Sequence, residues 1–313
     1  MATALRPPQT KPIKSIDGYV GRFAPSPSGH LHFGSLVTAL GGFLQAKSQN
    51  GRWLLRIEDI DPPREVAGAS DSIMRCLEAH HLFWDGEVVY QSNRSELYND
   101  NIRRLSEQGL TYHCQCSRVQ LAGLKQGQLC LCANQHLGAK NNSIRFRYQD
   151  TQQHFHDELL GHVEFPKQGL SSQFAIKRKH DLFAYQLAVV VDDIQQGITE
   201  VARGADLVDS TFFQLALYKA FDSSVPKFLH FPIVVTEPGK KLSKHNYACE
   251  VEINDASTNL VNALEFLGLP LTKELKQESA ENILTWAIHV WDLRNIPAKT
   301  ECIDNRIGQA DSI

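Results

Sequence analysis

YVGRFAP (19–25), HFGSLVTALGGFLQAKSQNG (32–51) and WLLRI (53–57) form an almost continuous stretch that decides the fold. The first segment is typical of a short strand that ends in a proline-rich turn, and the third is typical of a buried strand. Between them, apolar side chains three and four positions apart predict a helix whose buried face is formed by Leu36, Leu40, Phe43 and Leu44. This strand, helix, strand order predicts an α/β fold on a parallel sheet.

The same alternation continues along the chain and is then interrupted. Asp61 with its two following prolines is expected to open a helix, in which Val66, Ala69, Ile73 and Leu77 recur at helical spacing. A further helix ends near Gly109. After it, a cysteine-rich segment leads to SIRFRY and HVEF, which alternate like antiparallel strands.

The α/β pattern resumes with LFAYQLAVVVDD, STFFQLALYKAF and FPIVV, and two helical segments follow. We therefore predict a mobile extension (1–15), a first half of the catalytic domain (16–109), an inserted subdomain (110–180), a second half (181–250) and a helical C-terminal region (251–313).

Bulk composition excludes several classes of protein. The 313 residues are 42% apolar and 21% charged, and no apolar run approaches the roughly 18 residues of a membrane span. No signal-peptide segment opens the chain, so we predict a cytoplasmic protein without a membrane partner. A net charge of −3 argues against unspecific nucleic-acid binding over the whole surface, so any nucleic acid must meet a local patch.

The turn APSPSGHLHFGS (24–35) lies between the first strand and the first helix. Backbone N–H groups and the helix dipole attract phosphate at such a place. His30 and His32 stand beside it and can donate hydrogen bonds to phosphoryl oxygens. The alternative is a surface loop with incidental histidines.

A second basic loop, GKKLSKHNYA (239–248), follows the predicted strand FPIVV. Lys241 and Lys244 can close onto a polyphosphate, although many such runs are solvated turns. Taken together, HFGS and KLSKH resemble the two signature sequences of class I aminoacyl-tRNA synthetases. RFAPSPSGHLHFGS, RIEDIDPPRE, DLFAYQLAVVVDD and EVARGADL resemble the glutamyl branch of that family.

The resemblance implies a Rossmann-like parallel sheet with an inserted zinc-bearing α+β subdomain and a short helical C-terminal region. It implies a glutamate site formed by Arg22, Phe23, Ala24, Pro25, Ser26, Glu58, Tyr185 and Arg203. It implies an ATP site formed by His32, Gly34, Ser35, Lys241, Ser243 and Lys244.

The chemistry of the substrate supports this site. Glutamate has two carboxylates and one ammonium group, so its pocket needs a guanidinium group and an acid. Arg22 at the end of a strand and Arg203 in a glycine-flanked loop can supply the first, and Glu58 the second. Glu58 and Asp59 could equally be an ordinary acidic surface pair or a helix cap.

The reaction that the resemblance implies requires no protein nucleophile. The glutamate α-carboxylate attacks the α-phosphorus of ATP and expels pyrophosphate. The protein aligns the reactants and stabilises the charge on the phosphates. The groups expected to do so are Mg²⁺ brought with ATP and the side chains of His30, His32, Lys241 and Lys244.

Four of the seven cysteines lie within 19 residues, in a C-x-C, thirteen-residue, C-x-C arrangement. Paired thiolates separated by a loop are typical of tetrahedral zinc, and the family resemblance also indicates zinc here. The family pattern has a tyrosine as its third member, whereas this chain has Cys130, so the expected ligands are Cys114, Cys116, Cys130 and Cys132. Reduced cysteines without metal are the alternative.

Only 68 residues follow His245, which is short for an anticodon-binding domain of about 100 residues. In this, the chain resembles the truncated, glutamyl-queuosine-forming branch of the family. That resemblance implies a monomer that activates L-glutamate without tRNA and transfers it to queuosine in the anticodon stem-loop of tRNA(Asp). The basic run 177–180 is either an RNA contact or a solvated patch. The rival functions are charging of a tRNA 3′ end and an inactive zinc-containing RNA-binding module.

Overall fold

In the computed structural model, residues 18–124, 128–147, 154–165, 173–237, 240–241 and 251–304 are described. The predicted extension, residues 1–15, lies outside these ranges. Within them, no helix is both long and apolar enough to cross a membrane.

The opening stretch folds as predicted into a strand, a helix and a parallel strand. These are β1 (Val20–Phe23), α1 (Phe33–Ser48) and β2 (Arg52–Ile57), with Val20 opposite Arg52. The apolar face of α1 is buried, including Leu36, Leu40 and Leu44 at 0% exposure. The short strand β3 (Val89–Tyr90) continues the sheet in parallel beside β2.

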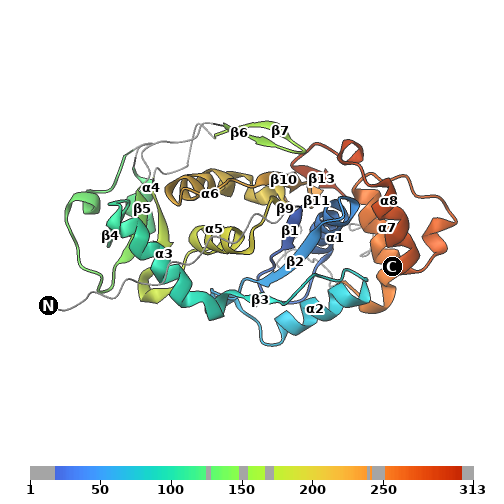
Figure 1. The fold of residues 1–313 in the computed structure, drawn as a ribbon, viewed down its shortest axis with the longest axis horizontal. Helices are drawn as coiled ribbons and strands as arrows, with labels where there is room; N and C mark the ends of the chain where they lie inside the picture. The colour runs from blue at the N-terminus through green and yellow to red at the C-terminus, as the bar shows by residue number, and fades with distance from the viewer. Residues whose placement is uncertain are drawn as a thin grey trace.

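The second half of the sheet lies on the other side of β1 (Figure 1). Strands β9 (Glu200–Gly204) and β10 (Lys227–Phe231) run parallel. The Thr199 amide, just before β9, donates to the Val20 carbonyl over 2.9 Å and so joins the two halves. Helices α3 (Ser95–Glu107), α5 (Tyr185–Gln196) and α6 (Val208–Ala220) pack beside this half.

One predicted helix begins later than its apolar spacing indicates. Residues Pro62–Arg64 form a single 3₁₀ turn, and α2 (Ala69–Ala79) starts only after Gly68. Gly68 has a left-handed φ of 77°, which interrupts a right-handed helix. Val66, which was predicted to share the helical spacing, therefore lies before the helix and is 51% exposed, while Ile73 and Leu77 are buried.

The strands after Gly109 are antiparallel, as predicted, but they belong to two different sheets. Strand β4 (Thr111–Cys114) pairs with β5 (Ser143–Arg147), and β5 pairs with β8 (Gln173–Lys177). The short helix α4 (Arg118–Ala122) follows β4.

The HVEF segment instead belongs to a hairpin of β6 (His154–Asp157) and β7 (Gly161–Glu164), which attaches to β10. A segment predicted to lie in the insertion thus joins the sheet that contains β9 and β10. The division of the chain at 110 and 180 stays a prediction.

The C-terminal part packs against the first half of the sheet. Helices α7 (Ala256–Phe266) and α8 (Ala280–Val290) confirm the predicted helical character and share a core with α1. The tail also contains a strand that the sequence did not indicate, β13 (Glu301–Ile303), parallel to β11 (Ile233–Glu237). The two-residue strand β12 (Lys240–Lys241) pairs with the other side of β11.

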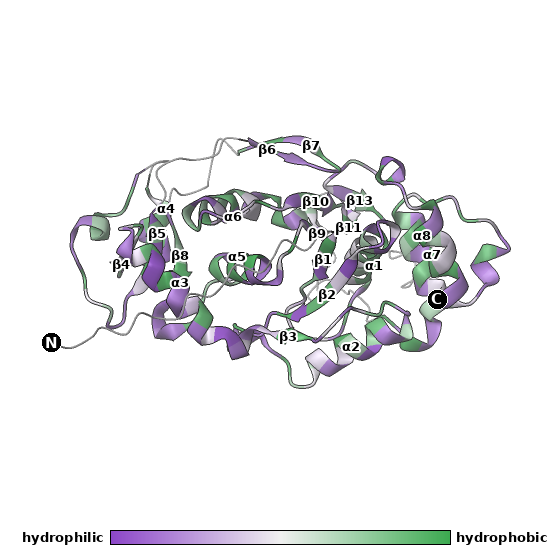
Figure 2. Ribbon diagram, viewed as in Figure 1, coloured by the Kyte–Doolittle hydropathy of each residue, from purple (hydrophilic) through white to green (hydrophobic). Residues whose placement is uncertain are grey.

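Hydrophobic residues concentrate where helices meet the sheets. Figure 2 shows α5 and α6 largely in the hydrophobic colour, and buried residues of both helices share one core with Val20 and Phe228. A second core contains α1, β2 and the two C-terminal helices. Together the two cores enclose the strands whose carboxyl ends form the site described next.

Candidate functional site

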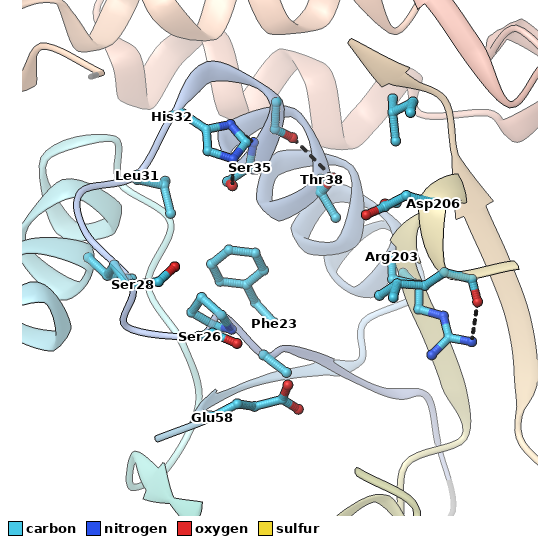
Figure 3. Close-up of a pocket in the computed structure, with 18 of the residues that line it drawn as sticks. Phe23, Ser26, Ser28, Leu31, His32, Ser35, Thr38, Glu58, Arg203 and Asp206 are labelled. Carbon is cyan, nitrogen blue, oxygen red and sulfur yellow. Dashed lines mark hydrogen bonds between the residues drawn. The ribbon is translucent and has the colours of Figure 1, made fainter. Parts of the chain in front are cut away.

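A cavity of about 300 Å³ opens at the carboxyl ends of β1, β2 and β9. All eight residues of the predicted glutamate site line it, as do four residues of the first signature: His30, His32, Gly34 and Ser35. Figure 3 shows Glu58, Arg203 and the His32–Ser35 pair on different sides of this space. The structure therefore brings together side chains that are up to 181 positions apart in the sequence.

Arg22 lies in β1, and a buried carboxylate holds its guanidinium group in place. Its Nε donates to Asp193 Oδ1 over 3.2 Å, and its Nη1 donates to the Ala202 carbonyl over 3.3 Å. Both side chains are 3% exposed. Burial would raise the pKa of Asp193, but the guanidinium groups of Arg22 and Arg56 outweigh burial and hold that pKa below its usual value. Asp193 is therefore the ionised counterion of Arg22.

Arg56, in β2, connects the same acid to the predicted amine ligand. Its Nη1 lies 2.8 Å from Asp193 Oδ1, and its Nη2 lies 3.4 Å from Glu58 Oε1. Burial raises the pKa of Glu58 to about 7, although Arg56 and Arg22 both oppose the shift. Glu58 faces the cavity with a carboxyl group that loses its proton near neutral pH.

Arg203 differs from the other two arginines because its partners are neutral. Its Nε donates to His230, its Nη1 to Gln214 at 2.9 Å and Tyr185 at 3.4 Å, and its Nη2 to Thr211 at 2.7 Å and the Leu207 carbonyl at 3.2 Å. Within the described residues, no carboxylate lies within ion-pair distance of it. Burial lowers the pKa of Arg203. A buried cation without a counterion beside a cavity is a strong site for an anionic group.

Arg203 was predicted in a glycine-flanked loop, and this prediction is wrong. The residue lies in β9, directly opposite His230 of β10. The strand is buried between β1 and β10, which fixes the guanidinium more rigidly than a loop would.

The first signature forms the N-terminal end of α1. His32 is the N-cap, and its Nδ1 accepts from the Ser35 amide over 3.2 Å, while its Nε2 lies 3.0 Å from Ser35 Oγ. His30 is exposed, and its Nδ1 lies 2.5 Å from Ser72 Oγ. The helix N-terminus and His32 therefore face one end of the cavity, where an anion is stabilised.

The second signature lies mostly outside the described residues. Lys241 belongs to β12, and Ser243 and Lys244 fall in the undescribed range 242–250. Just before that range, Lys241 is the backbone partner of Val235, which follows the cavity residue Val234. Just after it, the Val251 amide donates to the carbonyl of the cavity residue Leu31 over 3.0 Å.

The four cysteines converge as their spacing predicts. The Sγ atoms of Cys114, Cys116, Cys130 and Cys132 all lie within 4.8 Å of one another. The pairs Cys114–Cys130 and Cys116–Cys132 are 3.6 and 3.5 Å apart. A tetrahedron with Zn–S bonds of 2.3 Å has S–S edges of about 3.8 Å, so the cluster fits this ion. Burial raises the pKa of Cys114, which means that a buried thiolate is unfavourable without a partner. A bound cation stabilises the thiolate and displaces the proton.

The basic run 177–180 has partners within the protein. Lys177 Nζ lies 3.1 Å from Asp181, Arg178 Nη1 lies 3.2 Å from Asp61, and Lys179 Nζ donates to the Gln115 carbonyl over 3.3 Å. Contact with RNA by this run stays a prediction.

Several polar residues around the cavity were not predicted from the sequence: Arg56, Asp193, Asp206, Thr211, Gln214 and His230. One signal was present for Asp193. Two acids end the apolar run LAVVV, whose composition is typical of a buried segment, and buried acids require cationic partners.

Comparisons with known proteins support one family. The family described as "tRNA synthetases class I (E and Q), catalytic domain" matches residues 19–287. The glutamyl-Q tRNA(Asp) synthetase of Vibrio vulnificus is 46% identical over 283 residues, which are 90% of this chain and 93% of that protein. The protein of the same name from Salmonella typhi is 48% identical over 282 residues, 89% and 94% of the two chains.

The fold has solved counterparts at lower identity. The glutamate-tRNA synthetase of Elizabethkingia anophelis superposes with a TM-score of 0.74 at 21% identity, covering 92% of this chain and 68% of that one. The methionyl-tRNA synthetase of Mycobacterium tuberculosis superposes with a TM-score of 0.54 at 12% identity, covering 87% and 68%. Fold, signatures and sequence identity agree: this chain is an enzyme that belongs to the class I tRNA synthetases, within the group of glutamyl-Q tRNA(Asp) synthetases.

Proposed function

We propose that this enzyme activates L-glutamate with ATP and transfers the glutamyl group to the queuosine base of tRNA(Asp). The names of its relatives, at 45–48% identity over about 90% of the chain, support the reaction. The observation that carries the assignment of glutamate to the cavity is Arg203, a buried guanidinium whose hydrogen-bond partners are all neutral.

The side-chain carboxylate of glutamate binds Arg203. Arg22 and Arg56 share the counterion Asp193, so they attract a substrate carboxylate less strongly than Arg203 does. The ammonium group binds Glu58, and Tyr185, which accepts a hydrogen bond from Arg203, also lines the cavity. Neutral analogues such as glutamine leave the buried cation unpaired, which discriminates against them.

ATP lies along the N-terminal end of α1 with its phosphates near His32 and Ser35. An oxygen of the glutamate α-carboxylate forms a bond to the α-phosphorus, the bond from that phosphorus to the β-bridging oxygen breaks, and pyrophosphate leaves with the electron pair. Mg²⁺, brought with ATP, neutralises phosphate charge. The protein contributes hydrogen bonds from the helix terminus and His32, and His30 lies at the rim.

Lys241, Ser243 and Lys244 complete the phosphate site. Residues on both sides of the range 242–250 adjoin the cavity through Val235 and Leu31, which supports this placement. Ammonium groups there stabilise the pyrophosphate as it leaves.

The cysteine cluster holds one structural Zn²⁺ through four thiolates. The donor set is closed and three of the four residues are buried, which is typical of structural rather than catalytic zinc. The ion would stabilise the segment that joins β4 to β5 and take no part in adenylate formation.

The RNA partner is the anticodon stem-loop of tRNA(Asp) with queuosine at the wobble position, and the acceptor is a hydroxyl of its cyclopentene ring. Unstacked loop bases can enter a cleft in this way. The enzyme acts as a cytoplasmic monomer. Charging of a tRNA 3′ end and an inactive RNA-binding module are the rival functions.

Amino-acid-dependent ATP–pyrophosphate exchange tests the activation step. The purified full chain, with zinc present and without RNA, is incubated with each amino acid in turn. Exchange with L-glutamate and little with glutamine or aspartate is expected. Lack of glutamate-dependent exchange contradicts the enzymatic proposal.

Transfer of labelled glutamate tests the acceptor. tRNA(Asp) with and without queuosine is compared, each with an intact 3′ end or with the terminal adenosine removed. Label is expected on both queuosine-containing RNAs and on neither of the others. Label that requires the terminal adenosine instead identifies the enzyme as one that charges the 3′ end.

A further inference from the structure

Three buried side chains form a chain of hydrogen bonds that starts in the β6–β7 hairpin and ends at the cavity. Asp157 Oδ2 lies 2.6 Å from His230 Nδ1, and Arg203 Nε donates to His230 Nε2 over 3.0 Å. Asp157 and His230 are 0% exposed, and Arg203 is 4% exposed. Asp157 does not line the cavity and comes from a segment far from the signatures in sequence.

The direction of these bonds fixes the state of the imidazole. An arginine Nε can only donate, so His230 must accept at Nε2 and carry its proton on Nδ1. That proton is donated to Asp157, whose other oxygen accepts from the amides of Leu159 and Leu160 over 3.0 and 2.9 Å. The turn of the hairpin thus orients the carboxylate that orients the imidazole.

The neutral imidazole separates two charges that would otherwise pair. A carboxylate in contact with Arg203 would cancel its charge, as Asp193 does for Arg22. With His230 in between, the guanidinium is held at a fixed angle while its charge is still available to a ligand. Phe228 packs on the same guanidinium at 5.5 Å and stacks with the His230 ring, so the arrangement is rigid.

We propose that His230 and Asp157 are positioning residues that hold Arg203 oriented, with its charge uncompensated, to receive the side-chain carboxylate of the amino-acid substrate. This inference rests on the proposed function, because it concerns the site of glutamate. The two residues act through Arg203 and do not touch the substrate.

The tautomer is tested directly by ¹⁵N NMR of the imidazole nitrogens in the full-length protein, with the His230 signals assigned from H230Q. A protonated Nδ1 and a bare Nε2 are expected. A proton on Nε2, or a cationic ring at pH 7, overturns the proposal without any activity measurement.

Asp157→Asn tests the function of the carboxylate. The asparagine oxygen can still accept from Leu159 and Leu160, but its NH₂ group faces Nδ1 and forces the imidazole proton onto Nε2, against the Arg203 donor. The KM for glutamate in the exchange assay is expected to rise about tenfold or more, while the KM for ATP stays within about twofold. An unchanged glutamate KM, with the NMR tautomer switched, contradicts the proposal.

A pair of His230 variants separates hydrogen bonding from packing. His230→Gln retains an acceptor for Arg203 and a donor for Asp157, so its glutamate KM is expected within about threefold of wild type. His230→Phe keeps the bulk and loses both bonds, and its glutamate KM is expected to rise about tenfold or more. Equal behaviour of the two variants overturns the proposal.

Two controls complete the test. His80→Gln replaces another fully buried histidine, which bonds the Cys76 carbonyl and Asn259 away from the cavity, and its glutamate KM is expected unchanged. In the Arg203→Ala background, Asp157→Asn is expected to cause no further rise in the glutamate KM, because Asp157 acts only through Arg203. A further rise in that KM contradicts the proposal. Absent exchange by the wild type would refute the proposed function, whereas normal exchange with insensitive variants refutes only the positioning role.

Discussion

Arg22 Nε and Asp193 Oδ1 lie 3.2 Å apart, both nearly inaccessible to solvent, although 171 positions separate them in the chain. The same carboxylate oxygen accepts from Arg56. Asp193 therefore pairs with two arginines behind the cavity, where Glu58 and Asp192 also lie within ion-pair distance of Arg56. Arg203, on the other side, has no acidic partner among the described residues. This asymmetry makes the cavity selective for an anion at one end.

Asp193→Ala is expected to destabilise the protein by about 3–5 kcal/mol, because it leaves the buried Arg22 guanidinium without its carboxylate partner and removes one of the three acids around the buried Arg56. The free energy of unfolding, measured by urea titration, checks this. Asp209→Asn, which alters an exposed acid of α6, is the matched control and should change stability by less than about 0.5 kcal/mol. Equal stability of the two variants would refute the role of Asp193.

Arg203→Ala is expected to reduce kcat/KM for glutamate by about 2–5 kcal/mol, or roughly 30-fold to several thousand-fold, through loss of the carboxylate partner. The KM for ATP should change little. Arg203→Lys keeps a charge but loses the planar fork, so an intermediate defect is expected. An unaltered KM for glutamate in the alanine variant contradicts the assignment.

The affinity for glutamate should depend on pH through Glu58. Its pKa in the free protein is raised by burial to about 7, so below pH 7 the group is mostly protonated and cannot pair with an ammonium group. Binding then requires loss of a proton. The KM for glutamate is expected to fall about tenfold for each unit of pH rise below 7 and to level off above it.

Glu58→Gln supplies the control for that profile. The variant cannot titrate, so its KM should be high and should lack this pH dependence. If wild type and variant show parallel profiles between pH 5.5 and 8, another group is responsible.

Cys132→Ser is expected to abolish zinc binding and to lower the melting temperature, since a closed four-thiolate site loses one ligand. Metal analysis of the purified protein should give about one zinc per wild-type chain. Cys302→Ser, in β13 and outside the cluster, should retain it. Equal zinc contents in both variants would show that the cluster does not bind the ion.

Gly41→Ala should destabilise the contact between α1 and the sheet. A Cβ at Gly41 would lie 2.7 Å from the buried Phe231 ring, so about 1–3 kcal/mol of overpacking is expected in thermal or urea unfolding. At Gly123, which has a helical backbone and no neighbour within 3.7 Å of an added Cβ, the same change should be neutral or stabilising by about 0.4–1 kcal/mol. A Gly41 variant as stable as wild type would show that the interface relaxes.

Local sequence patterns were sufficient to predict much of the site. The helical spacing of α1 and the turn that precedes it predicted the helix terminus at which His32 lies, and the cysteine spacing predicted a cluster that the structure assembles. The start of α2 was missed because the periodicity of its apolar residues extends past Gly68, whose backbone conformation ends the pattern. The attachment of the β6–β7 hairpin to β10 was missed because strand alternation does not identify the partner strand.

The sequence by itself determined the α/β order, the two signatures and the residue types that a dicarboxylic amino acid requires. Only the tertiary structure decided which arginine has a counterion: Asp193 pairs with Arg22 and Arg56, while His230 separates Arg203 from Asp157. The reason is that charge compensation in a buried site depends on distances of a few ångströms between residues far apart in the chain, from 27 positions for Arg203 and His230 to 171 for Arg22 and Asp193. Periodicity and motif spacing describe neighbours along the chain and carry no such distances.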